Sequence, residues 1–86
     1  MEERVLSATY RELSAKDVEF LEAMLPDRRE SRMGTIASRM GVSSGCAAKY
    51  KTRLLALGAI RQMGRGVVAF DMPGLRAYVA SRANEG

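Results

Sequence analysis

The chain has 86 residues, of which 47% are hydrophobic and 28% charged, a composition typical of one small folded domain. No apolar run approaches the roughly 20 residues that a membrane-spanning helix needs. One cysteine, Cys46, and no histidine exclude an internal disulfide, Ser-His or Cys-His catalysis and the common zinc sites. We therefore expect a protein that is not an enzyme and that holds no cofactor or metal. Because Met1-Glu2-Glu3-Arg4 lacks the features of a signal peptide, we also expect it in the cytoplasm.

The net charge of +4 is unevenly distributed along the chain. Residues 1–31 carry five basic and eight acidic groups, whereas residues 32–86 carry nine basic and two acidic groups. Residues 31–70 contain seven Lys or Arg and no acid. One-sided charge of this kind is typical of a surface that binds an anion, nucleic acid above all. A solvated basic face is the alternative, so charge alone does not decide the function.

A helix is predicted over residues 14–25. Ser14-Ala15-Lys16-Asp17 has the form of a capping box, and Pro26 ends the segment. Val18, Leu21 and Leu25 recur with helical spacing, which predicts one buried face. Phe20 and Met24 widen that face. We expect Val18 and Leu21 to meet Ile36 and Leu54 in the core.

Two further helices follow. Residues 27–30 are predicted to form a charged loop, with Ser31 as the N-cap of a helix over about 32–40 and Gly41 at its end. Ser43 or Ser44 is the next N-cap, opening a helix that continues to about residue 57 and stops at Gly58. Two helices joined by so short a link predict a helix-turn-helix.

A period-two pattern then replaces the helical one. Residues 59–62 and 67–70 are predicted as two strands on either side of the turn segment Met63-Gly64-Arg65-Gly66. Pro73 opens a last helix, whose Leu75, Tyr78 and Val79 are expected to close the core. The predicted fold is α+β and mainly helical: a winged helix-turn-helix with a three-helix core, a β-hairpin wing and a C-terminal helix. We expect it to occupy residues 13–80, after a linker or partial helix over 1–12 and before a frayed tail over 81–86.

Several short segments also carry a family resemblance. They are Leu13-Ser14-Ala15-Lys16-Asp17, Phe20-Leu21-Glu22-Ala23-Met24, Ile36-Ala37, Met40-Gly41-Val42-Ser43, Tyr50-Lys51-Thr52-Arg53-Leu54, Gly58-Ala59-Ile60, Gly64-Arg65-Gly66, Phe70-Asp71-Met72-Pro73 and Leu75-Arg76-Ala77-Tyr78. With them, residues 10–78 resemble the C-terminal winged-helix domain of certain bacterial AAA-type ATPases. The resemblance implies a DNA-binding or regulatory appendage of an ATPase. The chain itself has no phosphate-binding loop of the G-x-x-x-x-G-K-[ST] type.

The third predicted helix is the candidate recognition helix. At about 100° per residue, Ala47, Tyr50, Leu54 and Leu57 share one face, which is predicted to be buried. The residues expected to contact DNA are Ser44, Gly45, Lys49, Lys51, Thr52 and Arg53, with Arg65 at the hairpin turn. Few of these side chains can read a base edge, so we expect weak binding by the monomer and little discrimination among sequences.

Two functions follow from this pattern. The first is a double-stranded DNA-binding module of low sequence specificity, used alone or as part of an ATPase or regulator. The alternative is a protein-interaction or regulatory winged helix of an AAA-type ATPase that does not bind DNA. The expected partners are accordingly double-stranded DNA, an ATPase domain in a parent protein and a second copy of the chain, with no membrane.

Overall fold

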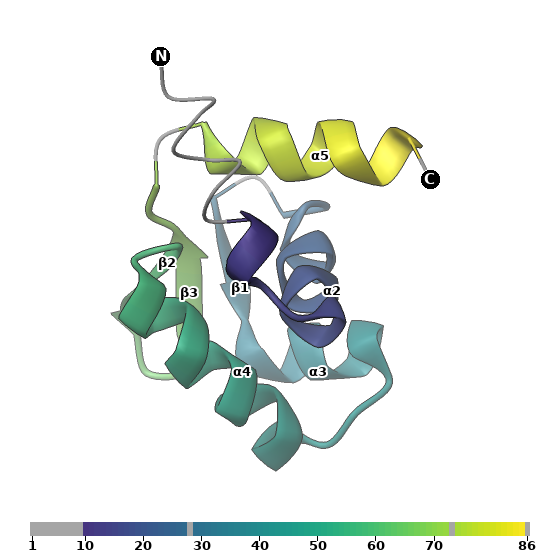
Figure 1. Cartoon of the computed structure of the whole chain (residues 1–86). Coiled ribbons are helices and arrows are strands. Elements are labelled where there is room, and N and C mark those ends of the chain that lie inside the picture. Colours follow the sequence, from purple (N-terminus) through teal and green to yellow (C-terminus); the bar gives the residue numbers. More distant parts are fainter. Residues whose placement is uncertain (1–9, 28, 73, 86) are drawn as a thin grey trace.

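The computed structural model describes residues 10–27, 29–72 and 74–85. It confirms the predicted α+β, mainly helical class, with three helices, a hairpin and a C-terminal helix in the order of a winged helix (Figure 1). Residues 10–12 are helical, whereas residues 1–9 and the expected helix-opening Pro73 lie outside the described residues. The elements are α2 (Ala15–Met24), β1 (Glu30–Arg32), α3 (Met33–Met40), α4 (Ser44–Leu57), β2 (Ile60–Gly64), β3 (Val67–Phe70) and α5 (Leu75–Glu85).

The capping box of α2 is formed as predicted, but its buried face is not centred where the sequence indicates. Ser14 Oγ accepts from the Asp17 N–H at 3.1 Å, and the Ser14 N–H donates to Asp17 Oδ2 at 3.0 Å. Phe20 and Leu21 are fully buried, whereas Val18 is only half-buried and lies outside the core cluster. The expectation for Val18 is therefore wrong. Burying the larger Phe20 ring removes more apolar surface from water, so the helix turns that side chain inward.

Strand β1 replaces the expected helix cap at Ser31. Ser31 lies in the middle of β1, is buried, and donates its hydroxyl to Asp27 Oδ2 at 2.6 Å. Helix α3 begins after Arg32, whose side chain makes no capping hydrogen bond. The prediction of Ser31 as N-cap is wrong because the strand pairs antiparallel with β3, placing Ser31 opposite Val68. Pairing with a remote strand gives the backbone N–H and C=O groups of this segment the hydrogen bonds that a helix cap would otherwise supply.

The helix-turn-helix between α3 and α4 agrees with the sequence prediction. Gly41 ends α3 and Gly58 ends α4, each in the left-handed conformation with φ of 74° and 77°. Ser43 is the N-cap of α4, and its Oγ accepts from the Cys46 N–H at 3.2 Å. Three local signals thus set the end of α3 and both ends of α4.

Replacing Gly41 by alanine is expected to lower the free energy of unfolding by about 1 kcal/mol, because a Cβ disfavours the left-handed conformation. Gly45→Ala is a matched control, since neither glycine would place a Cβ within 4 Å of another group and Gly45 has an ordinary φ. Gly45→Ala should raise the stability by about 0.5 kcal/mol. Urea denaturation measures both values, and a shift of the same sign in the two variants would contradict the argument.

The three strands form an antiparallel sheet in the order β1-β3-β2. The hairpin turn is Arg65-Gly66, in which Gly66 has φ of 68°, and a register shift between Gln62 and Gly64 makes a bulge at Met63. We call β2, the turn and β3 the wing. Helix α5 continues to Glu85, so it ends later than the sequence indicates.

A single core joins the helices to the sheet. Leu75 and Val79 of α5 are fully buried in it and Tyr78 packs against it, as predicted. None of the described helices combines the length and the apolar character that crossing a bilayer requires. The core cluster consists of Phe20, Leu21, Ala23, Met24, Ile36, Leu54, Ala59, Ile60, Val68, Leu75 and Val79.

Candidate nucleic-acid interface

Helix α4 lies on the opposite side of the molecule from α5 and presents its outward face there (Figure 1). The buried side of α4 is anchored by Ala47 and Leu54, with Tyr50 and Leu57 half-buried beside them. Its predicted DNA-contacting residues divide as follows: Ser44, Gly45, Lys49, Thr52 and Arg53 are exposed, and Lys51 is half-buried. The helical period therefore assigns the outward face correctly.

Arg53 is bound to a carboxylate that the sequence did not connect with it. Its Nε donates to both Asp17 oxygens at 3.2 and 3.1 Å, and its Nη2 donates to Oδ2 at 2.9 Å. The Asp17 side chain is fully buried, whereas 49% of the Arg53 side chain is exposed. The pair links the first turn of α2 to α4 and gives Arg53 a structural role.

The Asp17 carboxyl is ionised although it is buried. Burial acts to raise its pKa, yet the hydrogen bonds from Arg53 and Ser14 together outweigh burial and hold that pKa below its ordinary value. The same hydrogen bond from Arg53 to Asp17 raises the pKa of the guanidinium. The charge of Arg53 is thus largely balanced inside the domain.

The two lysines of α4 differ from Arg53 in having no carboxylate partner among the described residues. The Lys49 ammonium lies 5.6 Å from the centroid of the Tyr50 ring, an arrangement that leaves its charge available to an anion. Lys51 lies about 200° around the helix from Arg53, on the other flank of α4. Thr52 donates its hydroxyl to the Ala48 carbonyl at 3.1 Å, which removes that proton as a donor to DNA.

The wing adds cations next to α4, which packs against β2. Arg65 is exposed at the turn, as predicted. Arg32 lies opposite Val67, and the next residue ties the start of α3 to the turn through a 2.8 Å hydrogen bond from Met33 N to the Gly66 carbonyl. Strand β1 therefore brings a further exposed arginine close to the turn of the wing, which sequence reasoning missed because it did not find β1.

Arg61 is the second wing cation that the sequence analysis did not select. It lies opposite Ala69 on β3, two residues from the partner of Arg32, so both arginines are on the same face of the sheet. Both arginines are exposed, although Ala69, which lies between Arg61 and Glu30 on this face, is itself buried. The pairing of the strands, which the sequence alone does not show, reveals the position.

Five of the seven cations in the acid-free stretch have no ion-pair partner among the residues that the structure describes. The two that are neutralised are Arg39, by Asp27, and Arg53, by Asp17. The remaining five come from β1, α4 and the wing. They are Arg32, Lys49, Lys51, Arg61 and Arg65, and we call them the basic set.

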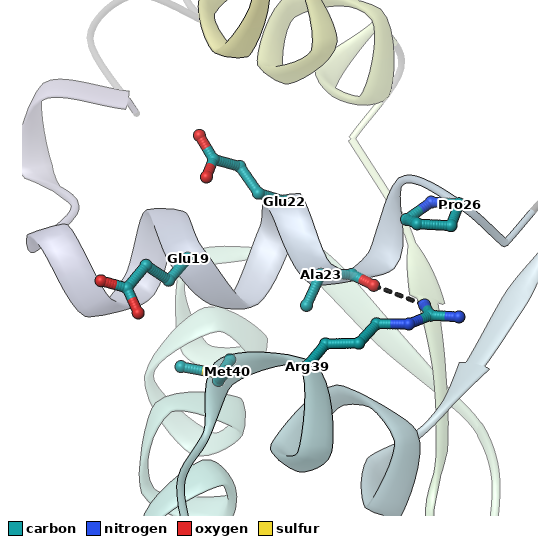
Figure 2. A pocket seen from close by; sticks show the side chains of 6 residues that line it. All are labelled: Glu19, Glu22, Ala23, Pro26, Arg39 and Met40. Carbon is teal, nitrogen blue, oxygen red and sulfur yellow. Dashed lines mark hydrogen bonds between the residues drawn. The ribbon is translucent and has the colours of Figure 1, made fainter. Parts of the chain in front are cut away.

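A hollow of about 330 Å³ lies between α2 and α3. Figure 2 shows the residues that line it, among which Arg39 is again a structural residue. Its Nη1 donates to the Ala23 carbonyl at 2.6 Å and to Asp27 Oδ2 at 2.8 Å. Hydrogen bonds from Arg39 and Ser31 hold the pKa of Asp27 below its ordinary value. The carboxylates of Glu19 and Glu22 are directed away from Arg39. This hollow is thus built around contacts that hold the two helices together.

Residues 3–79 match the family described as "Domain of unknown function (DUF8462)". The chain belongs to this family. The matched region contains α2, all three strands and the helix-turn-helix, so the DUF8462 domain includes the candidate interface. No curated protein and no solved structure matches the chain. The resemblance to the appended domains of AAA-type ATPases stays a prediction.

Proposed function

We propose that this domain binds double-stranded DNA through α4 and the wing, with little preference for sequence. The observation that carries the proposal is the basic set, whose five cations come from adjoining elements and have no described carboxylate partner. Lys and Arg on adjoining elements attract the phosphate backbone, and binding releases the counterions condensed on DNA.

The outward side chains of α4 favour contacts with phosphates over contacts with base edges. Gly45, Ala48 and Ala56 offer no side-chain hydrogen bonds at outward positions, and the hydroxyl proton of Thr52 is used within the helix. Arg53 is the arginine of this helix, and Asp17 holds it. The bidentate contacts that distinguish one base pair from another are therefore scarce.

Weak binding is the consequence for an isolated domain. Sequence-independent binding typically has a Kd of about 10⁻⁴–10⁻⁶ M at physiological salt. A second copy, or attachment to an ATPase domain in a longer protein, would raise occupancy through effective concentration. In that setting the domain would deliver the ATPase to DNA.

A protein-interaction role is the second candidate. The small outward residues Gly45, Ala48 and Ala56 would let the backbone of a partner protein approach α4 closely. A regulatory domain of this kind would pack on an ATPase or another partner and leave DNA unbound. The two functions differ in whether the domain binds duplex DNA at all.

A titration with a fluorescent random-sequence duplex at about 50 and 200 mM salt separates them. If the basic set contacts phosphates, affinity should fall steeply between the two conditions. Replacing both Lys49 and Lys51 by alanine should weaken binding at low salt and lower the slope of log affinity against log salt by about two units.

Arg11→Ala combined with Lys16→Ala is the control, because it removes two exposed positive charges outside α4 and the wing. That variant should keep most of the affinity and slope. If the Lys49 and Lys51 variant binds as the parent does, α4 is not the interface. No binding by the parent at low salt would favour the protein-interaction role.

A further inference from the structure

Met63 is the large hydrophobic side chain that stands out as exposed on the described part of the chain, with 47% of its surface accessible. The other methionines of that part, Met24, Met33, Met40 and Met72, lie in or against the core. An isolated exposed apolar residue is ordinary by itself. The surroundings of Met63 are what distinguish it.

Met63 lies in the wing between two cations. Arg61 precedes it by two residues and Arg65 follows it by two, and all three side chains are exposed. The bulge between Gln62 and Gly64 interrupts the register at Met63. Bulges commonly re-aim a side chain and bend a strand away from its partner.

Gly64, the next residue, is the last residue of β2, directly after the bulge. Its φ is not in the left-handed range, unlike that of Gly66, and a Cβ added to it would meet nothing within 4 Å. A side chain would thus fit there, and strand interiors ordinarily disfavour glycine. Glycine in a strand often marks a bulge or a close approach by a ligand or another backbone. The bulge accounts for glycine here, and the open space beside it leaves room for a ligand next to Met63.

We propose that Met63 inserts between base pairs from the minor groove of duplex DNA, while Arg61 and Arg65 contact the phosphates on either side. This inference rests on the proposed function. The minor groove is about 6 Å wide, so side chains of the wing can enter it but the two-stranded hairpin cannot. Unbranched apolar side chains serve as wedges of this kind in proteins that bend DNA.

Insertion of Met63 would give the domain a preference for certain base-pair steps, which the side chains of α4 do not supply. Unstacking costs least at pyrimidine–purine steps, TA above all, so such steps would be favoured without hydrogen bonds to base edges. DNA recognition would then depend on deformability, and the bound duplex would bend away from the inserted side chain.

The test uses two duplexes that differ only in one central step, TA or AA, with 2-aminopurine beside the step and dyes at the ends. The domain should bind the TA duplex roughly fivefold more tightly. Binding should also raise the 2-aminopurine fluorescence, which reports unstacking, and the energy transfer between the ends, which reports bending.

Met63→Gln should abolish the preference, the unstacking signal and the bend, while retaining salt-dependent binding to both duplexes. Met63→Leu keeps an apolar side chain and should retain all three. The Lys49→Ala, Lys51→Ala variant should lose affinity for both duplexes equally and keep their ratio.

Three results would overturn the wedge. If the domain binds both duplexes equally, with no unstacking or bending, or if Met63→Gln keeps the preference, then the proposed function stands and the wedge is wrong. If the domain binds neither duplex at low salt, both fail, and exposed Met63 would then be assigned to a protein contact.

Discussion

Leu54→Ala should lower the free energy of unfolding by about 2–5 kcal/mol. Leu54 is fully buried and belongs to the same cluster as Phe20, Leu21 and Ile36, so it joins α4 to α2 and α3. Truncation removes apolar contacts and leaves a cavity. Small domains have about 5–15 kcal/mol of stability, so the change removes a large share of it.

Leu57→Ala is the matched control for that variant. It makes the same substitution in the same helix, but Leu57 is only half-buried and lies outside the core cluster. In urea denaturation, the free energy of unfolding that Leu57→Ala loses should be well below the loss in Leu54→Ala. A loss at Leu54 under about 0.5 kcal/mol would be in the range of a surface substitution and would contradict the packing of α4.

The features that sequence reasoning located correctly are those set by near neighbours. Ser14 with Asp17, Ser43 with Cys46 and the left-handed Gly41 each depend on groups within four residues. Such signals can be read from a few adjacent letters, because the hydrogen bonds they form are local. They fix the start of α2, the end of α3 and the start of α4, and therefore the helix-turn-helix.

Strand β1 was missed for the opposite reason. Three residues are too few to show a period of two, and their backbone partners lie on β3, remote in the sequence. Missing the strand also misassigned Ser31 and concealed Arg32 as a neighbour of the wing. The buried side of α2 was misjudged similarly. Val18 and Phe20 are both apolar, and the sequence pattern does not show which of them the space between the packed helices will hold.

The candidate interface was only partly predictable. Periodicity identifies which residues of α4 face outward, but it says nothing about where a long side chain ends. Arg53 reaches a carboxylate 36 residues earlier, and Arg39 reaches one 12 residues earlier. Counting the charges of residues 31–70 therefore overestimates the cations available to DNA, because two of the seven are neutralised within the fold.

The buried ion pair predicts how stability depends on pH. The pKa of Asp17 is lowered in the folded state, so the folded chain holds the proton of this carboxyl less tightly than the unfolded chain does. The resulting stabilisation is present above the unfolded value of about 3.9 and is lost as the pH falls through the folded pKa. Asp27 acts in the same direction, since its pKa is also lowered.

Asp17→Asn should lower the free energy of unfolding by about 1–3 kcal/mol at neutral pH, because it removes a charge that accepts hydrogen bonds from Arg53 and from the start of α2. The difference from the parent should shrink as the pH falls below about 3.9, where the unfolded chain takes up the proton, and should be lost once the pH passes the lowered pKa of the folded chain. Urea denaturation at about pH 7 and pH 3 measures both values.

Asp27→Asn is the control. The Asp27 carboxyl is partly exposed, so this variant should lose less free energy of unfolding at neutral pH. A deficit in Asp17→Asn that is equally large at both pH values would show that the shape of the side chain, and not its charge, stabilises the junction between α2 and α4.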